Sequence, residues 1–349
     1  MEKRKQLAGV FCRMLLRMCL VTFIALIFGM NGGVMAQDPI FSQFYFAPTQ
    51  LNPAFVGNSR GPNFGLNYRN QWPSMPNAYT TYAVSYDQFF ESYNSGIGMI
   101  LMSDNAGDGI LTTNKVALQY SYRGQLNQDL FLKGGIEFAF VQNNLAWEKL
   151  VFFDQLDPEF GSTTSGGTTL PTSEVPPEST TVFYPDISFG LALYSPIFYG
   201  GVVLHHMNNP SNSFYSDANP LHSGVPIRWT LHGGAQLTSG GKNARAGAPF
   251  LSPNFIFANQ GPFKQLNLGL HGGVGSIFGG LAFRHSWTIP DAVIISFGVR
   301  TGSMRIGYSF DYTVSSLGIS TGGAHEIGVQ YRIERENRVN YNDCFGLFR

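Results

Sequence analysis

Most of the chain after residue 61 alternates apolar and polar residues with a period of two. In the run 304–313, for example, Met, Ile, Tyr, Phe and Tyr alternate with Arg, Gly, Ser, Asp and Thr. A period of two is the repeat of a β-strand, whose successive side chains point to opposite faces. One face is bulky and often aromatic, and the other is small or charged. That contrast is expected of a wall between lipid and water, and it restricts the chain to sheets with two unlike faces.

The number and length of these segments favour a barrel. Several are longer than the ~5–6 residues usual in soluble sheets, and an even number is typical of bacterial single-chain barrels. The chain has 41 Gly, 30 Phe and 16 Tyr with only 13% charged residues, which suits tight turns and aromatic girdles. We therefore predict an all-β fold, a transmembrane antiparallel β-barrel of about 14 strands within residues 61–335; a soluble array of β-sandwiches is the alternative. The predicted strands are about 63–70, 79–89, 95–103, 111–123, 129–143, 183–194, 197–206, 226–237, 249–259, 264–273, 276–287, 291–301, 303–314 and 324–335.

The connections between these segments differ systematically in length. The even-numbered ones are mostly tight, whereas the odd-numbered ones include the two longest, 144–181 and 207–224. Short turns on one side and long loops on the other are typical of outer-membrane barrels, whose long loops are extracellular. The connection 239–248 is longer than expected for a periplasmic turn. We expect the long loops outside and both termini in the periplasm.

The first 36 residues have the pattern of a secretory signal peptide. An apolar run extends from Cys19 to Met30 and is too short to span a bilayer. It follows a basic region that contains Lys3, Arg4, Lys5, Arg13 and Arg17. Cleavage after Ala36 would start the mature chain at Gln37. This removes five of 22 basic and one of 22 acidic residues, which leaves a net charge of −4 and gives no reason to expect a nucleic-acid partner. Of three cysteines only Cys344 remains, in an expected periplasmic tail, 336–349.

Residues 37–60 differ from the rest because they lack any clean period. They are aromatic, and the pairs Asp38-Pro39 and Asn52-Pro53 favour extended or turned backbone over helix. This segment is either a plug inside the barrel or a rim that receives a partner, and we favour the plug. The residues that we expect to make its contacts are Phe41, Phe44, Tyr45, Phe46, Asn52 and Pro53.

Charged residues fall on the small-residue face of the predicted strands, where the lumen should be. If they are paired, they fill the lumen with a salt-bridged network instead of leaving a wide pore. A barrel of ~14 strands lies between the filled ~8-strand type and the open ~16-strand porins, so size alone does not decide. His232, His271 and His325 also lie near this face. The candidate network residues are Asp87, Arg123, Glu137, Arg228, Arg305, Asp311, Glu326 and Arg332.

No motif in the sequence indicates catalysis, a cofactor or a metal. The stretch 104–109, DNAGDG, lacks the alternate acids and the closing Glu of a calcium loop, so a tight turn is favoured. His205 and His206 are adjacent and would point to opposite faces of a strand. A nucleophile elbow and an HExxH motif are both missing. We therefore expect a protein that is not an enzyme and uses no cofactor.

Several motifs, in order along the chain, are similar to those of one family. They are QDP at 37–39, FSQFY at 41–45, LNPA at 51–54, YRNQW at 68–72, SYD at 85–87, YGG at 199–201, HMN at 206–208 and HEI at 325–327. Together they resemble the PorP/SprF family of outer-membrane proteins in the type IX secretion and gliding systems. The tail around Cys344 is only a partial match. The resemblance spans nearly the whole mature chain.

The resemblance implies an outer-membrane barrel that works with type IX secretion components, or with a large secreted adhesin that carries a type B C-terminal domain. Such a protein aids secretion or surface anchoring, or gliding motility, through protein contacts at the cell surface. A channel for small, hydrophobic molecules with an N-terminal plug is the alternative. A secretion component predicts a stable protein partner, whereas a channel predicts a conducting or ligand-filled lumen.

Overall fold

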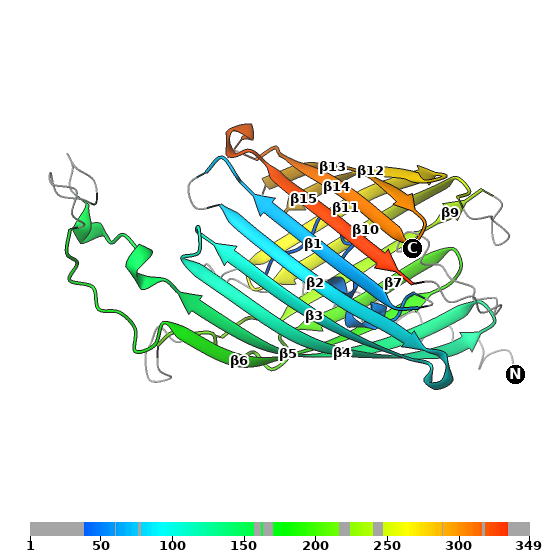
Figure 1. The fold of residues 1–349 in the computed structure, drawn as a ribbon, viewed down its shortest axis with the longest axis horizontal. Helices are drawn as coiled ribbons and strands as arrows, with labels where there is room; N and C mark the ends of the chain where they lie inside the picture. The colour runs from blue at the N-terminus through cyan, green and yellow to red at the C-terminus, as the bar shows by residue number, and fades with distance from the viewer. Residues whose placement is uncertain are drawn as a thin grey trace, which may run out of the picture.

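The computed structural model describes residues 38–59, 61–75, 78–156, 162, 170–215, 224–239, 247–287, 289–315 and 318–333. The predicted signal peptide, the predicted periplasmic tail 336–349 and Cys344 lie outside these residues. The described chain forms one antiparallel sheet that closes on itself, as Figure 1 shows. Its strands are β1 (Asn63–Gln71), β2 (Tyr79–Phe90), β3 (Ser95–Ala106), β4 (Leu111–Asn127), β5 (Leu130–Leu145), β6 (Thr181–Tyr194), β7 (Phe198–His205), β8 (Arg228–Ala235), β9 (Leu237–Thr238), β10 (Phe250–Gln260), β11 (Phe263–Val274), β12 (Ile277–Ser286), β13 (Ile289–Thr301), β14 (Met304–Thr313) and β15 (Ala324–Arg332).

Fourteen of these strands make the closed barrel, and the prediction of a 14-stranded antiparallel barrel is confirmed. Each strand pairs with its neighbours in sequence, β1 pairs with β15, and β10 pairs with β11 to complete the ring. The extra strand β9 continues β8 for two residues and pairs with β10. It is separate because the Gln236 N–H turns to the Ile197 carbonyl, 2.7 Å away, at the end of β8.

The two faces of the wall differ as the sequence pattern predicts. On β2, Tyr82 and Val84 face outward with exposed fractions of 51% and 47%, whereas Ala83 and Asp87 between and beyond them are buried at 1% and 2%. The same alternation of buried and exposed residues runs along β1, β4, β5 and β14. Lipid would cover the outer apolar face, since a closed barrel satisfies all backbone hydrogen bonds internally.

The barrel has two unlike ends. One end, here called the long-loop end, holds the connections 146–180, 206–227 and 314–323. The other, the short-turn end, holds tight connections such as 128–129, 275–276 and 302–303, together with the longer 236–249. In Figure 1 the β5–β6 connection extends as an arm well beyond the strands at the left. The Asp154 carboxylate pins this arm, because it accepts hydrogen bonds from the Ser173 N–H at 2.7 Å and from the Thr172 hydroxyl.

Helices are few and short among the described residues. Besides single turns in the connections, they are α2 (Pro48–Leu51) and the 3-10 helix η1 (Pro53–Phe55), both in the N-terminal segment. None of the described helices has the length and apolar character needed to cross a membrane.

Candidate functional site: the N-terminal segment in the barrel lumen

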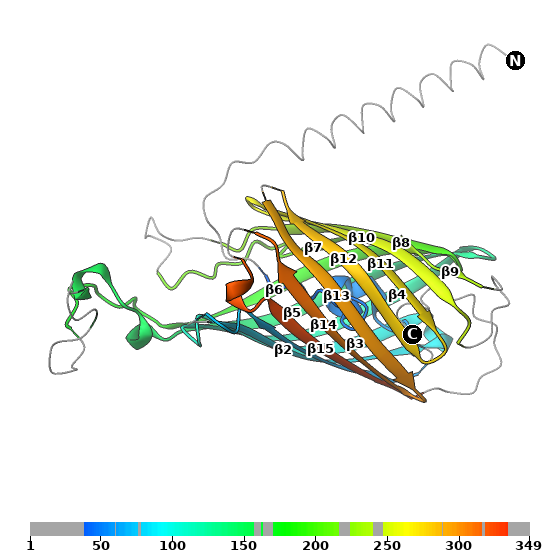
Figure 2. The same cartoon turned by 90° about the horizontal axis from the view of Figure 1, so that it is seen from above.

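Residues 38–59, here called the plug segment, lie inside the barrel and run along its length. At the long-loop end the Asp38 N–H donates to Gln260 Oε1 at 3.3 Å, and Gln260 ends β10. At the short-turn end the Gly57 N–H donates to Asp87 Oδ2 at 2.9 Å, just before β1 begins. Figure 2 shows this dark-blue segment within the ring of strands. Of the two alternatives from the sequence, plug and rim, the plug is found.

The direction of the plug segment separates the ends of the described chain. Asp38 lies at the long-loop end, whereas Arg332, the last residue of β15, pairs with Asn63 at the short-turn end. Both ends of the chain itself lie outside the described residues, so the periplasmic placement of the termini stays a prediction.

The backbone of the plug segment turns tightly in its second half. Pro48 and Pro53 each stand at the first turn of a helix, where a missing N–H costs nothing. The Asn52 side chain accepts a hydrogen bond from the Ala54 N–H at 2.8 Å and so caps η1. These local signals fold the aromatic stretch into a compact body that fits the barrel interior.

A cluster of buried charges holds the plug segment at residues 42 and 43. The Ser42 and Gln43 N–H groups donate to the two oxygens of Glu326 at 2.7 and 2.9 Å, and the Ser42 hydroxyl donates to Asp311 at 2.7 Å. Arg69 bridges Asp311, at 3.1 Å, and Glu326. Because all three charged side chains are almost fully buried, their pairing satisfies charges that would otherwise be costly to desolvate.

Arg284 extends this cluster along the wall. Its Nη1 lies 2.7 Å from Asp311 Oδ2, and its Nε pairs with Asp291. The same Nη1 donates to the Ser42 hydroxyl at 3.1 Å. This one cluster, which holds the plug segment, therefore takes side chains from five neighbouring strands, β12, β13, β14, β15 and β1.

A second cluster fixes the start of the plug segment at the long-loop end. His206 Nε2 lies 2.6 Å and Arg228 Nη1 lies 2.9 Å from Asp38 Oδ2, and His206 Nδ1 lies 3.1 Å from Asp186. Burial alone would lower the pKa of His206, but the carboxylates of Asp38 and Asp186 outweigh it and raise that pKa to about 9. Burial would raise the pKa of Asp38, but His206 and Arg228 lower it overall. At neutral pH the cluster is therefore an ion pair.

Aromatic side chains fill the middle of the lumen. Tyr45 and Phe46 are each 1% exposed, and the Arg305 guanidinium lies 5.2 and 4.9 Å from their ring centroids. Arg305 also lies 4.3 Å from the ring centroid of Phe278. The guanidinium of Arg305 thus packs against three aromatic rings in the interior of the barrel.

Glycines in the wall make room for these rings. A Cβ atom added at Gly307 or Gly328 would lie 2.3 or 2.5 Å from the Phe46 ring. Deeper in, one added at Gly135 would lie 2.3 Å from the Ala54 nitrogen. The inner face of the wall therefore has glycine at positions where the plug segment approaches it too closely for a larger side chain.

Polar contacts hold the second half of the plug segment as well. Asn52 Nδ2 lies 2.9 Å from His232 Nε2 and donates to the Leu191 carbonyl at 3.2 Å. The Val56 carbonyl accepts hydrogen bonds from the Ser121 hydroxyl at 2.8 Å and from Lys133 Nζ. These bonds satisfy backbone and amide groups that are cut off from water.

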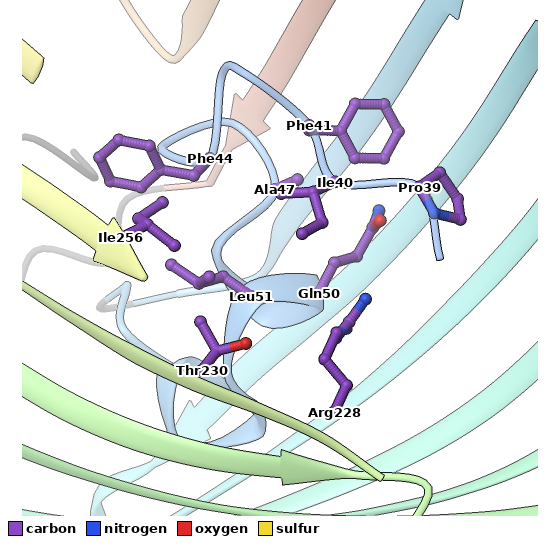
Figure 3. A pocket seen from close by; sticks show the side chains of 10 residues that line it. All are labelled: Pro39, Ile40, Phe41, Phe44, Ala47, Gln50, Leu51, Arg228, Thr230 and Ile256. Atoms are coloured by element: carbon purple, nitrogen blue, oxygen red, sulfur yellow. The ribbon is translucent and has the colours of Figure 1, made fainter. Parts of the chain in front are cut away.

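A small cavity remains between the plug segment and strands β8 and β10, shown in Figure 3. Its volume is ≈ 30 Å³, far below the ~150 Å³ of a cavity known to hold benzene. Leu51 and Ile256 give it an apolar side, and Arg228 and Gln50 a polar one. In this conformation it holds water-sized molecules and is not a passage. Its lining residues are Pro39, Ile40, Phe41, Phe44, Ala47, Gln50, Leu51, Arg228, Thr230 and Ile256.

The six plug residues singled out from the sequence all lie at contacts with the wall. Phe41 packs with Ala83 of β2 in one buried cluster, and Phe44 faces His271 with ring centroids 6.1 Å apart. Tyr45 and Phe46 stack with Arg305 as described. Asn52 and Pro53 fit against Gly190, where an added Cβ would lie 1.9 Å from the Asn52 side chain.

The eight predicted network residues do not form one network but several separate contacts. Asp311 and Glu326 share the cluster at Ser42, and Arg228 joins the cluster at Asp38. Glu137 pairs with Lys115 at 2.7 Å and accepts from Gln119. Each group also reaches the plug segment, since Gln119 donates to the Thr49 carbonyl at 2.8 Å.

The other four network residues lie toward the short-turn end. Asp87 accepts hydrogen bonds from Gly57 and Asn63. Arg305 stacks on aromatic rings, and Arg123 lies 4.4 Å from the Phe89 ring centroid. Arg332 is half-buried at the end of β15. These four residues thus lie toward the same end of the lumen.

Sequence reasoning missed several residues of the site. Arg69 and Lys115 have the inward parity of their strands, and counting alternation along β1 and β4 would have found them. Ser42 and His206 gave no such signal, since neither lies in a strand. His206 has a φ of 58°, a left-handed conformation that ends β7 and turns its ring inward.

Two histidine expectations were wrong. His205 and His206 do not lie on opposite faces, because His206 has left the strand; both are buried, with ring centroids 6.3 Å apart. His325 faces outward, where its Nδ1 lies 2.7 Å from the Tyr308 hydroxyl. Alternate residues of a strand share a face, so His325 points outward with Ile327, whereas Glu326 between them points into the lumen. The first half of the DNAGDG stretch ends β3, and its second half begins the β3–β4 turn, with positive φ at Gly107, Asp108 and Gly109.

Several solved structures are similar to this chain, at low sequence identity. Among solved structures, the CymD monoaromatic hydrocarbon channel is similar at 13% identity over 87% of this chain and 96% of that chain, with a TM-score of 0.43. A FadL homologue from Pseudomonas aeruginosa shares 12% identity over 87% and 96% of the two chains, with a TM-score of 0.46. The P. putida toluene transporter TodX shares 10% over 82% and 93%, with a TM-score of 0.46. No curated protein matches.

The sequence itself matches a protein family over most of its length. The model of the type IX secretion system membrane protein family PorP/SprF matches residues 34–331. That range includes the plug segment and all strands but the last residue of β15. The N-terminal segment inside the lumen and the barrel around it are thus covered by a single match, and the chain belongs to the type IX secretion system membrane protein family PorP/SprF.

Proposed function

We propose that this protein is a non-enzymatic outer-membrane component of type IX secretion that acts through protein contacts, and that it helps to secrete or anchor a large adhesin. The observation that carries the proposal is the filled lumen. A barrel whose interior is occupied by its own N-terminal segment offers partners its two ends and its loops. We infer the secretion system from the family to which the chain belongs, and we infer that the protein acts through protein contacts from its filled lumen.

The long-loop end supports the proposal with an exposed surface. The β5–β6 arm carries Phe153 and Val175, which are 92% and 76% exposed. We propose that these two side chains contact the partner, since apolar surface that a partner covers is removed from water. We place this end outside the cell and the short-turn end in the periplasm. With this orientation Asp38 faces the outside.

The test is a gentle-detergent pull-down of the tagged protein from outer membranes, with mass spectrometry of the proteins that follow it. We expect type IX components or one large secreted protein with a type B C-terminal domain. An unrelated outer-membrane barrel with the same tag is the control. The variant Phe153→Ser with Val175→Ser should lose the secreted protein, whereas Tyr93→Ser, 74% exposed at a short turn, should keep it.

A lone barrel, recovered again after crosslinking, would contradict the proposal. It would favour the alternative, an outer-membrane channel for small and possibly hydrophobic molecules. That alternative requires the plug segment to move, because the cavity beside it is ≈ 30 Å³. The proposal requires no such movement.

A further inference from the structure

The last residues of the plug segment meet a lysine of the wall near the short-turn end. Lys133 of β5 is 2% exposed, and its Nζ donates to the Val56 carbonyl and lies 3.2 Å from Asn58 Oδ1. The centroid of the Phe89 ring of β2 lies 5.5 Å from the same Nζ. A lysine amine, a side-chain amide and an aromatic ring therefore share one site that is shielded from water.

The side-chain amide of Asn58 is held at only one of its two polar atoms. Its Oδ1 accepts a hydrogen bond from Lys133. Its Nδ2 is cut off from water and has no hydrogen-bond partner among the residues that the structure describes. A buried donor without a partner is destabilising, and such groups are rare in native proteins, so this one calls for an explanation.

A carboxyl group lies beside these two side chains. Asp87 of β2 is 2% exposed and accepts a hydrogen bond at 2.9 Å from the N–H of Gly57, the residue before Asn58. It also interacts electrostatically with Lys133. An amine, an amide and a carboxyl group are the three parts that transfer of an acyl group to an amine requires: a nucleophile, an electrophile and a group that moves the proton.

We propose that Lys133 and Asn58 are joined by an intramolecular isopeptide bond, which ties the plug segment covalently to β5. The Nζ lone pair attacks Asn58 Cγ, the Nζ–Cγ bond forms, and the Cγ–Nδ2 bond breaks. Asp87 takes a proton from Nζ and passes it to Nδ2, which leaves as ammonia. No atom is oxidised or reduced, so the step needs no cofactor and no second substrate.

Position and burial both favour this step. Reacting atoms about 3–3.5 Å apart are placed for attack, and an amine 3.2 Å from Oδ1 is a short displacement from the adjoining Cγ. Lysine amines that are removed from water in apolar sites serve as nucleophiles in proteins. The product keeps one hydrogen on Nζ for the Val56 carbonyl, and the Nδ2 that had no partner is gone.

The test is a tryptic digest of the purified full chain after denaturation, followed by tandem mass spectrometry. Trypsin does not cleave after a lysine whose amine is acylated. We expect a branched peptide that joins the peptide ending at Arg60 to residues 124–149, uncleaved at Lys133. It should be lighter than its two parts together by about 17 Da, the mass of ammonia. Fragment ions should place the link between Asn58 and Lys133, which distinguishes it from a loss of ammonia at any other residue.

Variants of the three residues separate their roles. Lys133→Arg should abolish the branched peptide, and Asp87→Asn should lower its yield at least about tenfold. Asn58→Asp should give the same link with loss of water, because the bond that forms is identical. The matched control is Lys115→Arg, which replaces the lysine of β4 that pairs with Glu137 and should keep the branched peptide in full.

Cleavage after Lys133 in most of the unmodified protein would overturn the proposal. A branched peptide undiminished in Lys133→Arg or in Asp87→Asn, or one lost in Lys115→Arg, would overturn it as well. If a variant fails to fold, the digest of the unmodified chain still decides, because it needs no substitution. The inference goes beyond the proposed function and needs no secretion component, so its failure is distinct from a failed pull-down.

Discussion

The Asp38 carboxylate lies 2.6 Å from His206 Nε2 and so ties the first described residue of the plug segment to the end of β7. His206 also faces Asp186, His205 and Arg228, and the pKa of His206 is raised from 6.5 to about 9. A raised folded-state pKa stabilises the protein fully below the unfolded value and loses that contribution as pH rises through the folded value.

The first prediction is therefore that heat stability falls between about pH 6.5 and pH 9 as His206 loses its proton. The contribution lost is at most about 3 kcal/mol. The measurement is the heat-modifiability midpoint on gels across this range. His206→Gln should flatten the slope, and a slope unchanged in that variant would assign it to another group.

The second prediction concerns Glu326, whose oxygens accept the Ser42 and Gln43 N–H groups. Glu326→Gln leaves Arg69 with Asp311 alone and removes an acceptor from the plug segment. Breaking a buried pair in this way costs about 3–5 kcal/mol. We expect faster amide exchange in residues 38–47 by mass spectrometry. Exchange equal to that of the unmodified chain would show that the cluster does not hold the plug segment.

The third prediction tests the fit between Phe46 and the wall. Gly328→Ala places a Cβ 2.5 Å from the Phe46 ring, and overpacking of this kind costs about 1–3 kcal/mol. The midpoint of heat modifiability should drop, and Phe46→Ala added to the same chain should recover part of the loss. Gly200→Ala, whose Cβ meets nothing nearer than 3.8 Å, is the matched control. An equal loss in the control would refute the fit.

The sequence predicts the wall well and the pairing within it poorly. Period-two alternation marks each strand, because lipid and lumen select different residues, and it correctly placed residues such as Asp311 and Glu326 inside. Register depends on how each turn closes, which alternation does not report. Hence it did not show that Arg69 faces Glu326 or that Arg300 faces Arg305.

The sequence shows that the plug segment differs from the strands, because it lacks their period of two, but it does not show which residues of the wall the segment contacts. The pair Asn52-Pro53 was expected to favour extended or turned backbone over helix, whereas the structure has the short helices α2 and η1 on either side of Asn52, and Asn52 caps η1. The left-handed residue His206 gives no comparable signal, since its conformation follows from the loop that leaves β7. Its pairing with Asp38 joins positions 168 residues apart, a relationship that no local pattern encodes.

The most direct measurement of a filled lumen is the conductance of the purified full-length barrel in a planar bilayer. We expect no large steady conductance, because the plug segment occupies the interior from Asp38 to Gly57. The variant Glu326→Gln with Gly328→Ala should open larger, fluctuating currents, whereas Gly200→Ala should not. A large steady conductance of the unmodified protein would contradict the filled lumen and favour a channel.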